Sequence, residues 1–176
     1  VCIQGLTTAV GGGVIRDVIL GNTPPATFLN PIYASVALVT SLVLFLPRIR
    51  HLLMWDQRLY DLSMLILDSL GLGIFTVVGI RIAWRSTAEP TLFLLVFVGV
   101  VTGVGGGVIR DVMAGDMPYI FVKHIYACAS LAGALVCAGL WRPAGEVAAI
   151  LAGAGVVVLI RFLSAHYRWN LPRARD

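Results

Sequence analysis

Charge is what this sequence has least of: Asp, Glu, Lys and Arg make up only 12% of its 176 residues. Soluble domains carry about one quarter of such residues, so an ordinary soluble domain is excluded. Alternating strand patterns are absent too, and a transmembrane barrel is therefore not expected. Hydrophobic residues instead reach 59%. This composition is that of an integral membrane protein built from helices, with the lipid bilayer as its first partner.

The motifs of several other chemistries are missing as well. The chain has no HExxH or GxSxG motif, and its glycines match neither a dinucleotide fingerprint nor a P-loop. Its three cysteines and three histidines are scattered and form no disulfide or metal-binding pattern. We therefore expect no enzyme, no catalytic residue, no metal site and no cofactor. The net charge of +4 arises between and after the apolar runs, where membrane topology explains it better than nucleic-acid binding.

The apolar residues gather into six runs of about 15 to 22 residues, close to the ~20 that a helix needs to cross ~30 Å of hydrocarbon. Proline and glycine clusters separate several of these runs. We expect them to form one transmembrane domain that extends over 1–176. The expected spans are 1–15, 32–46, 59–80, 91–109, 125–141 and 144–163.

One octapeptide, GGGVIRDV, occurs twice, at 11–18 and at 105–112. A glycine inside a helix costs about 1 kcal/mol relative to alanine, so three in a row favour a break in the helix. Broken helices at membrane depth are typical of ion and solute paths, because the freed backbone groups can face the path. The alternative is close helix packing, which Gly99, Gly103 and Gly107 also suit because they follow one another at four-residue spacing. Both interpretations can hold together.

The duplication is longer than the motif. A shift of 94 residues superposes 5–24 on 99–118, and with one residue deleted it continues over 28–34 and 121–127. Phe28 and Phe121 are equivalent in this repeat and are candidate plugs of a path. The same shift places the counterpart of the span at 59–80 ahead of the first printed residue, so we expect a further helix there.

Two three-helix units and a final helix follow from that expectation, and a unit with an odd number of helices inserts its two copies in opposite orientations. We therefore predict an all-α polytopic membrane protein with an inverted repeat. The segment 1–47 is the remainder of the first unit, 59–141 is the second unit, and 144–163 is the last helix.

Charge bias orients this arrangement, because cytoplasmic loops carry an excess of Lys and Arg. With the two motif arginines set aside, eight basic residues fall on one side and three on the other. The larger group makes its side, and with it the C-terminus, cytoplasmic. The eight are Arg48, Arg50, Arg58, Lys123, Arg161, Arg168, Arg173 and Arg175, and the three are Arg81, Arg85 and Arg142.

The motif arginines lie in apolar surroundings and are expected to pair with buried acids, unless they snorkel to the membrane surface. Asp68 lies inside its span at a depth that matches Arg110, so we predict that these two form an ion pair. Arg16 would pair with the equivalent acid of the preceding helix. Neighbouring residues do not face each other on a helix, so Asp17 and Asp111 are expected to face elsewhere.

The duplicated GGGVIRD within three-helix inverted repeats resembles the prokaryotic branch of the trimeric intracellular cation (TRIC) channel family, whose domain also carries a glycine-transporter label. The resemblance implies seven transmembrane helices and a homotrimer in the cell membrane, with one pore through each protomer. It also implies passive conduction of monovalent cations, mainly K⁺, and a pore shaped by two glycine-broken helices. The glycines at these breaks would be Gly11, Gly12, Gly13, Gly105, Gly106 and Gly107.

Two functions remain open on the sequence, and a third fits less well. The first is a potassium-permeable channel in which backbone carbonyls and the carboxylates of Asp17, Asp68 and Asp111 favour cations. The second is a secondary transporter of a small solute such as glycine, since inverted repeats with broken helices also serve carriers. A membrane scaffold would explain the small residues but not the buried charges. The sequence favours a transport path, and only the resemblance favours a channel over a carrier.

Overall fold

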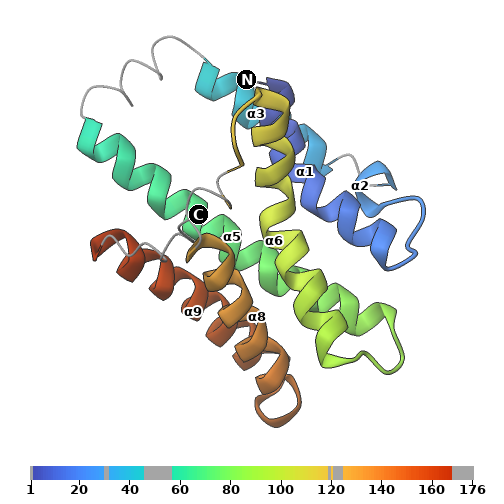
Figure 1. Cartoon of the computed structure of the whole chain (residues 1–176). Helices are drawn as coiled ribbons and strands as arrows, with labels where there is room; N and C mark the ends of the chain where they lie inside the picture. Colours follow the sequence, from blue (N-terminus) through green and yellow to red (C-terminus); the bar gives the residue numbers. More distant parts are fainter. Residues whose placement is uncertain (1, 30–31, 46–56, 119, 121–124, 168–176) are drawn as a thin grey trace, which may run out of the picture.

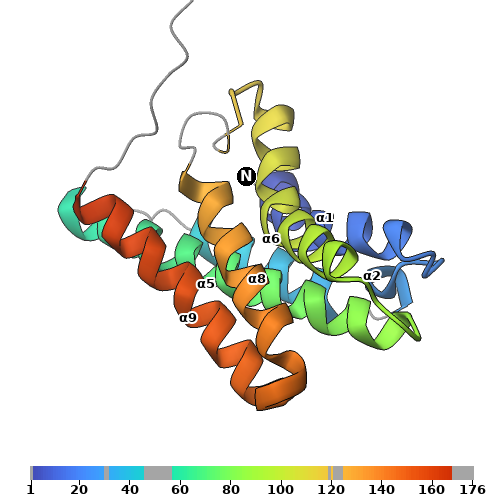
Figure 2. The same cartoon turned by 60° about the horizontal axis from the view of Figure 1, so that its bottom comes forward.

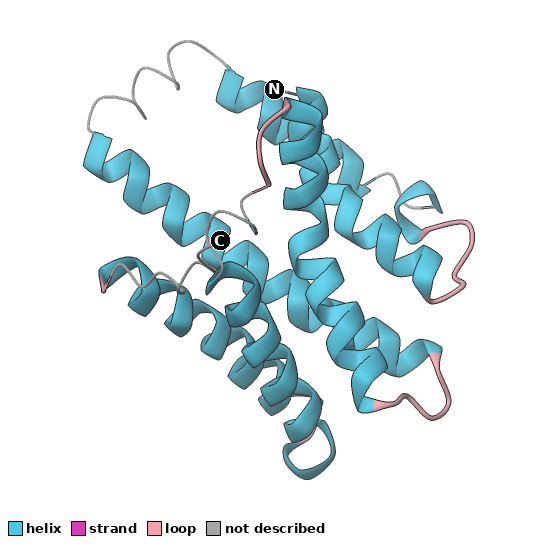
Figure 3. Cartoon of the chain, in the orientation of Figure 1, coloured by secondary structure: helices cyan, strands magenta, loops and turns pink. Residues whose placement is uncertain are grey.

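The computed structural model describes residues 2–29, 32–45, 57–118, 120 and 125–167, and all regular structure within them is helical (Figure 3). Four helices are long and apolar enough to cross a membrane. This confirms the predicted all-α polytopic class. The helices in chain order are α1 (Cys2–Ile19), α2 (Ala26–Leu29), α3 (Ile32–Phe45), α5 (Gln57–Ser86), α6 (Leu92–Ala114), α8 (Ile125–Ala144) and α9 (Glu146–His166). The four candidate spans are Leu62–Ser86, Leu92–Ala114, Ile125–Ala144 and Glu146–His166.

Helices α5 and α6 lie in the middle of the molecule. Figures 1 and 2 show the hairpin of α8 and α9 on one side of them, and α1 with the short α2 and α3 on the other. Helix α5 packs on α6, α8 and α9, whereas α1 packs mainly on α6 and α3. The two central helices therefore connect the group of α1, α2 and α3 with the hairpin of α8 and α9.

Helices α1 and α6 cross with their backbones in contact. A Cβ atom on Gly12 would overlap the carbonyl oxygen of Thr102, and a Cβ atom on Gly106 would overlap that of Thr8. A Cβ atom on Gly105 would lie 3.4 Å from the Gly12 Cα atom. Only glycine permits such a close approach of two backbones.

This crossing is symmetric under the repeat. A shift of 94 residues turns the Gly12–Thr102 contact into the Gly106–Thr8 contact, and the partners run in opposite directions along the two helices. The equivalent helices α1 and α6 are thus antiparallel copies related by a local two-fold axis. The geometry confirms the inverted repeat.

The ends of the two helices repeat as well. Gly21 and Gly115 are equivalent and have φ values of 73° and 77°, in the left-handed region that favours glycine. The next residue donates its N–H in both copies, from Asn22 to the Asp17 carbonyl at 2.8 Å and from Asp116 to the Asp111 carbonyl at 3.0 Å. Each motif therefore ends its helix with the same capping turn.

The predicted helix breaks at the glycine triplets are wrong. Helix α1 continues through 11–13 and α6 continues through 105–107 without interruption. The helical hydrogen bonds survive because the first two glycines of each triplet bring the partner helix into contact. Packing between helices then offsets the low helix propensity of glycine.

The other helix contacts also use small residues. A Cβ atom on Gly99 would lie 2.7 Å from Ile80 Cγ1, so α6 packs tightly on α5. Gly133 and Gly153 bring α8 and α9 together, since a Cβ atom on either would lie 2.6 to 2.9 Å from the carbonyl oxygen of the other. The interpretation as close packing is therefore correct for Gly99, and for Gly103, whose Cβ position overlaps the Thr76 hydroxyl.

The matched pair Gly106 and Gly107 tests this packing. We expect Gly106→Ala to destabilise the protein by about 1–3 kcal/mol, because the added methyl overlaps the Thr8 carbonyl in a packed crossing. Gly107→Ala meets no atom within 4 Å and should be neutral or stabilising by up to about 1 kcal/mol. Thermal unfolding of the purified proteins in detergent measures both. Equal melting temperatures for the two variants would contradict the close crossing.

Candidate ion pathway

Two half-open cavities of the molecule share part of their walls. One, of about 620 Å³, is lined mainly from α5, α6, α8 and α9, and the other, of about 570 Å³, is lined from α1, α3, α5, α6 and the start of α8. Five residues line both of them, and we call this shared wall the cavity junction. The junction residues are Met64, Asp68, Gly107, Arg110 and Tyr126. The sequence-predicted residues Asp68, Gly107 and Arg110 are thus brought together.

Asp68 is held by side chains from two other helices. Its Oδ2 atom lies 2.6 Å from a terminal guanidinium nitrogen of Arg161 on α9, and its Oδ1 atom accepts a hydrogen bond of 3.2 Å from the Tyr126 hydroxyl on α8. The Arg161 guanidinium also lies over the Tyr126 ring, 4.8 Å from its centre. Three helices therefore meet at one carboxylate.

The predicted pair of Asp68 with Arg110 does not form. Arg110 instead binds the next residue, Asp111, through Nε and a terminal nitrogen, each 2.8 Å from Oδ1. The prediction failed because it considered only the direction of the Cβ atoms, which differ between neighbours on a helix. An arginine side chain is long enough to bend back to the adjacent carboxylate, and Arg161 is the cation that reaches Asp68.

Arg16 makes the equivalent contact in the first repeat. Its Nε atom donates to Asp17 Oδ1 at 2.8 Å, and a terminal nitrogen lies at the same distance. Within the described residues Arg16 pairs with Asp17, and its predicted pairing with an acid of a preceding helix stays a prediction. The two copies of the motif therefore form the same kind of ion pair between neighbouring residues.

The two pairs differ in burial. The Arg16 and Asp17 side chains are 9% and 2% exposed, whereas those of Arg110 and Asp111 are 40% and 13% exposed. Asp17 also accepts a hydrogen bond of 2.9 Å from the Ala26 backbone N–H at the start of α2. Neither Arg16 nor Asp17 lines the two cavities, whereas Arg110 and Asp111 line the larger one. The inverted repeat thus supplies one buried pair and one pair open to a cavity.

The glycine triplets divide between packing and the cavities. Gly11 and Gly105 contact the crossing helix, as Gly12 and Gly106 do. Gly107 has nothing within 4 Å of its Cβ position and lies at the cavity junction. Its equivalent, Gly13, lines the smaller cavity. Gly12 and Gly106 line the smaller cavity as well as the helix crossing, and Gly107 is the triplet glycine that leaves open space at the junction.

The candidate plugs have different positions. Phe28 lies on α2, is 71% exposed and lines neither cavity. Phe121 lies outside the described residues. Plugging by either residue stays a prediction.

Sequence reasoning missed Arg161 and Tyr126. Arg161 was counted with the charges at the ends of the spans, yet its side chain is only 5% exposed. An arginine within the last apolar run was a usable signal, because a charge inside a span is costly unless it has a partner. Tyr126 had no such signal beyond its place at the start of a span.

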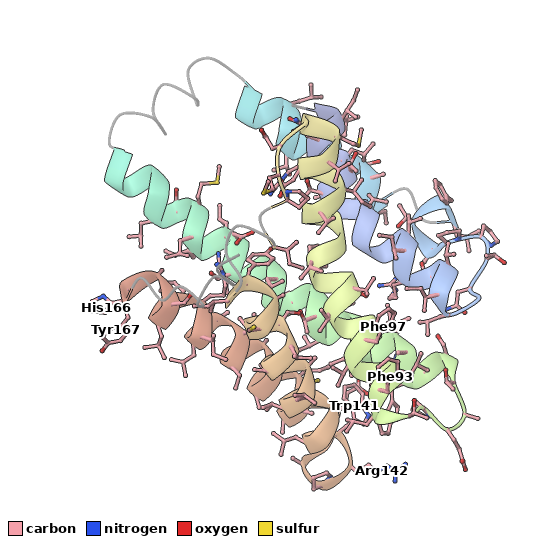
Figure 4. The ribbon with its side chains drawn as sticks, in the orientation of Figure 1. Phe93, Phe97, Trp141, Arg142, His166 and Tyr167 are labelled. Atoms are coloured by element: carbon pink, nitrogen blue, oxygen red, sulfur yellow. The ribbon has the colours of Figure 1, made fainter. Side chains whose placement is uncertain are left out.

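The ends of α5 and α8 that lie away from Asp68 carry polar and aromatic groups suited to a membrane surface. Trp84 and Trp141 stack with their ring centres 5.4 Å apart, and Arg142 lies 5.9 Å from the Trp84 ring centre. Figure 4 shows Trp141 and Arg142 at one end of the α8–α9 hairpin and Tyr167 at the other. Aromatic residues at both ends match the belts at the two membrane–water interfaces.

The difference in burial between the repeats predicts a difference in stability. Asp17→Asn leaves the buried Arg16 guanidinium without its counter-charge, so we expect a loss of about 3–5 kcal/mol. Asp111→Asn removes the equivalent charge beside a guanidinium that solvent can reach, and we expect a loss of about 1 kcal/mol or less. Thermal unfolding of both variants gives the comparison. A larger loss for Asp111→Asn would contradict the assigned burial.

Comparison with known proteins agrees with this architecture. The family model described as glycine transporter matches residues 1–48 and 65–142. The chain is 36% identical over 171 residues to the UPF0126 inner membrane protein YadS of Escherichia coli, covering 97% of this chain and 79% of that protein. It is 32% identical over 175 residues to the UPF0126 membrane protein YvgT of Bacillus subtilis, covering 98% and 81%.

Solved structures are similar over nearly the whole chain. One described under the structural basis for conductance through TRIC cation channels has a TM-score of 0.85 and 29% identity, covering 99% of this chain and 83% of that one. The TRIC orthologue from Rhodobacter sphaeroides has a TM-score of 0.74 and 28% identity, covering 96% and 94%. The chain therefore belongs to the TRIC channel family, whose family model carries the description glycine transporter.

Proposed function

We propose that the protein is a monovalent cation channel permeable to K⁺, with a path through the two cavities of each protomer. The observation that carries this proposal is the cavity junction, where spaces of about 620 and 570 Å³ share one wall that contains Asp68. The relatives of known structure are named as cation channels, which supports a channel over a carrier.

The chemistry of the wall supports cations. Asp68 and Asp111 line the larger cavity together with Arg110 and Arg161, and the two carboxylates are the groups on this wall that attract cations. Gly107 keeps the junction open, because it presents no side chain there. Asp17 is left out of the path, since it is buried against Arg16 and the start of α2.

The proposal includes the setting of the channel. The protein lies in the plasma membrane of a prokaryote as a multi-pass protein, with its C-terminus in the cytoplasm. It forms a homotrimer in which each protomer carries a path, and it uses no cofactor beyond the permeant ion. The names of the relatives support the membrane and the trimer, and the positive-inside bias of the basic residues supports the orientation.

A carrier for a small solute such as glycine is the second candidate. The larger cavity holds carboxylates beside guanidinium groups, which is the chemistry that a zwitterion needs, and the family description names glycine. Uptake of radiolabelled glycine into proteoliposomes separates the two functions. Saturable uptake without unitary currents would favour the carrier.

A bulky side chain at the junction tests the path. We expect unitary K⁺ currents from the purified protein in planar bilayers and a loss of at least about tenfold in conductance for Gly107→Leu, because the side chain enters the open space there. Gly139→Leu is the matched control. Gly139 also has nothing within 4 Å of its Cβ position, and it lines neither cavity.

The control should conduct as the unmodified protein does. Unchanged conductance in Gly107→Leu would remove the junction from the path, and equal losses in both variants would show a general effect of leucine on folding. Elution of each variant as one assembly on size exclusion checks that the channel is intact before recording.

A further inference from the structure

We propose that Arg161 of α9 limits cation flow by neutralising Asp68 at the cavity junction, so that the last helix acts as an inhibitory element. This inference rests on the proposed channel function. It assigns control of the path to a helix outside both repeats, through a residue that the repeat itself cannot supply.

The contact joins a buried arginine to a carboxylate that is 36% exposed. The Arg161 side chain is 5% exposed, and its guanidinium lies 2.6 Å from Asp68 Oδ2. Tyr126 holds both partners, since its hydroxyl donates to Asp68 and its ring lies under the guanidinium. Tyr126 therefore orients both charged groups toward each other in this arrangement of the helices.

The charges on the cavity wall balance only when Arg161 is present. Four charged residues line the larger cavity among those described, and they are Asp68, Arg110, Asp111 and Arg161. Arg110 is bound to Asp111 at 2.8 Å. Arg161 therefore cancels the one carboxylate that lies at the junction of both cavities, and without it the wall would carry a net negative charge.

Helix α9 is placed so that this contact can change. It packs on α5 and α8, and α1 and α6, which form the central crossing, are not among its main partners. A shift of α9 would move the Arg161 guanidinium relative to Asp68 while the α1–α6 crossing stays intact. The last helix can thus alter the charge of the path without rebuilding the repeat.

Recordings in planar bilayers with a KCl gradient test this control. We expect Arg161→Gln to raise the unitary K⁺ current by at least about threefold and to move the reversal potential toward that of K⁺, because one negative charge is uncovered where the two cavities meet. Arg161→Lys keeps the charge and should resemble the unmodified protein. The double variant Asp68→Asn with Arg161→Gln should also have the K⁺ current and reversal potential of the unmodified protein.

Arg142→Gln is the matched control, because it removes one positive charge at a position that lines neither cavity. The proposal is supported if Arg142→Gln conducts like the unmodified protein while Arg161→Gln carries a larger K⁺ current. Equal currents in Arg161→Gln and the unmodified protein would overturn it while leaving the channel function intact. Absence of K⁺ current from every protein, the unmodified one included, would instead refute the channel function.

A second variant keeps the test decisive if Arg161→Gln does not fold. Asp68→Asn leaves the Arg161 charge without its partner, so we expect a K⁺ current at least about threefold lower and a reversal potential shifted toward that of Cl⁻. A K⁺ current that Asp68→Asn does not change would overturn the proposal.

Discussion

Contact between the backbones of α1 and α6 is the constraint on which the rest of the structure depends. Gly12 and Gly106 each lie against a carbonyl oxygen of the opposite helix, which leaves no space for even one methyl group. Apolar surface alone drives helices together weakly in a bilayer, because lipid tails are as apolar as leucine, so close packing has to hold them. The crossing holds two equivalent helices antiparallel. The Arg16–Asp17 pair and the Arg110–Asp111 pair therefore lie on opposite sides of the crossing.

The motif charges follow from that crossing. Each arginine binds the acid beside it, so the cost of placing a cation among apolar residues is met inside a single turn of helix. The surroundings of the two motif copies then differ in how far they bury the ion pair. Asp17 is enclosed and caps α2, whereas Asp111 opens on the larger cavity, so equal sequences acquire a structural role in one repeat and a position on a cavity wall in the other.

The helix outside the repeat breaks the symmetry further. Helix α9 brings Arg161 to Asp68, while α8 brings Tyr126, and these contacts set the charge of the wall that the two cavities share. Among the described helices none is a repeat counterpart of α9, so the surroundings of the cavity junction differ from those of the buried Arg16 pair. One helix added to an inverted repeat therefore gives the two motif ends of the protein different surroundings.

The sequence by itself determined the membrane class, the helices, the inverted repeat and the residues Asp68, Gly107 and Arg110 of the junction. Hydropathy, a fixed shift of 94 residues and buried charges are local signals, and they need no knowledge of neighbours. Only the tertiary structure decided that the glycine triplets stay helical, that Arg110 binds Asp111, and that Arg161 binds Asp68. Those outcomes depend on which helices touch and how deeply each side chain is enclosed, and contact between segments far apart in the chain cannot be read from spacing along it.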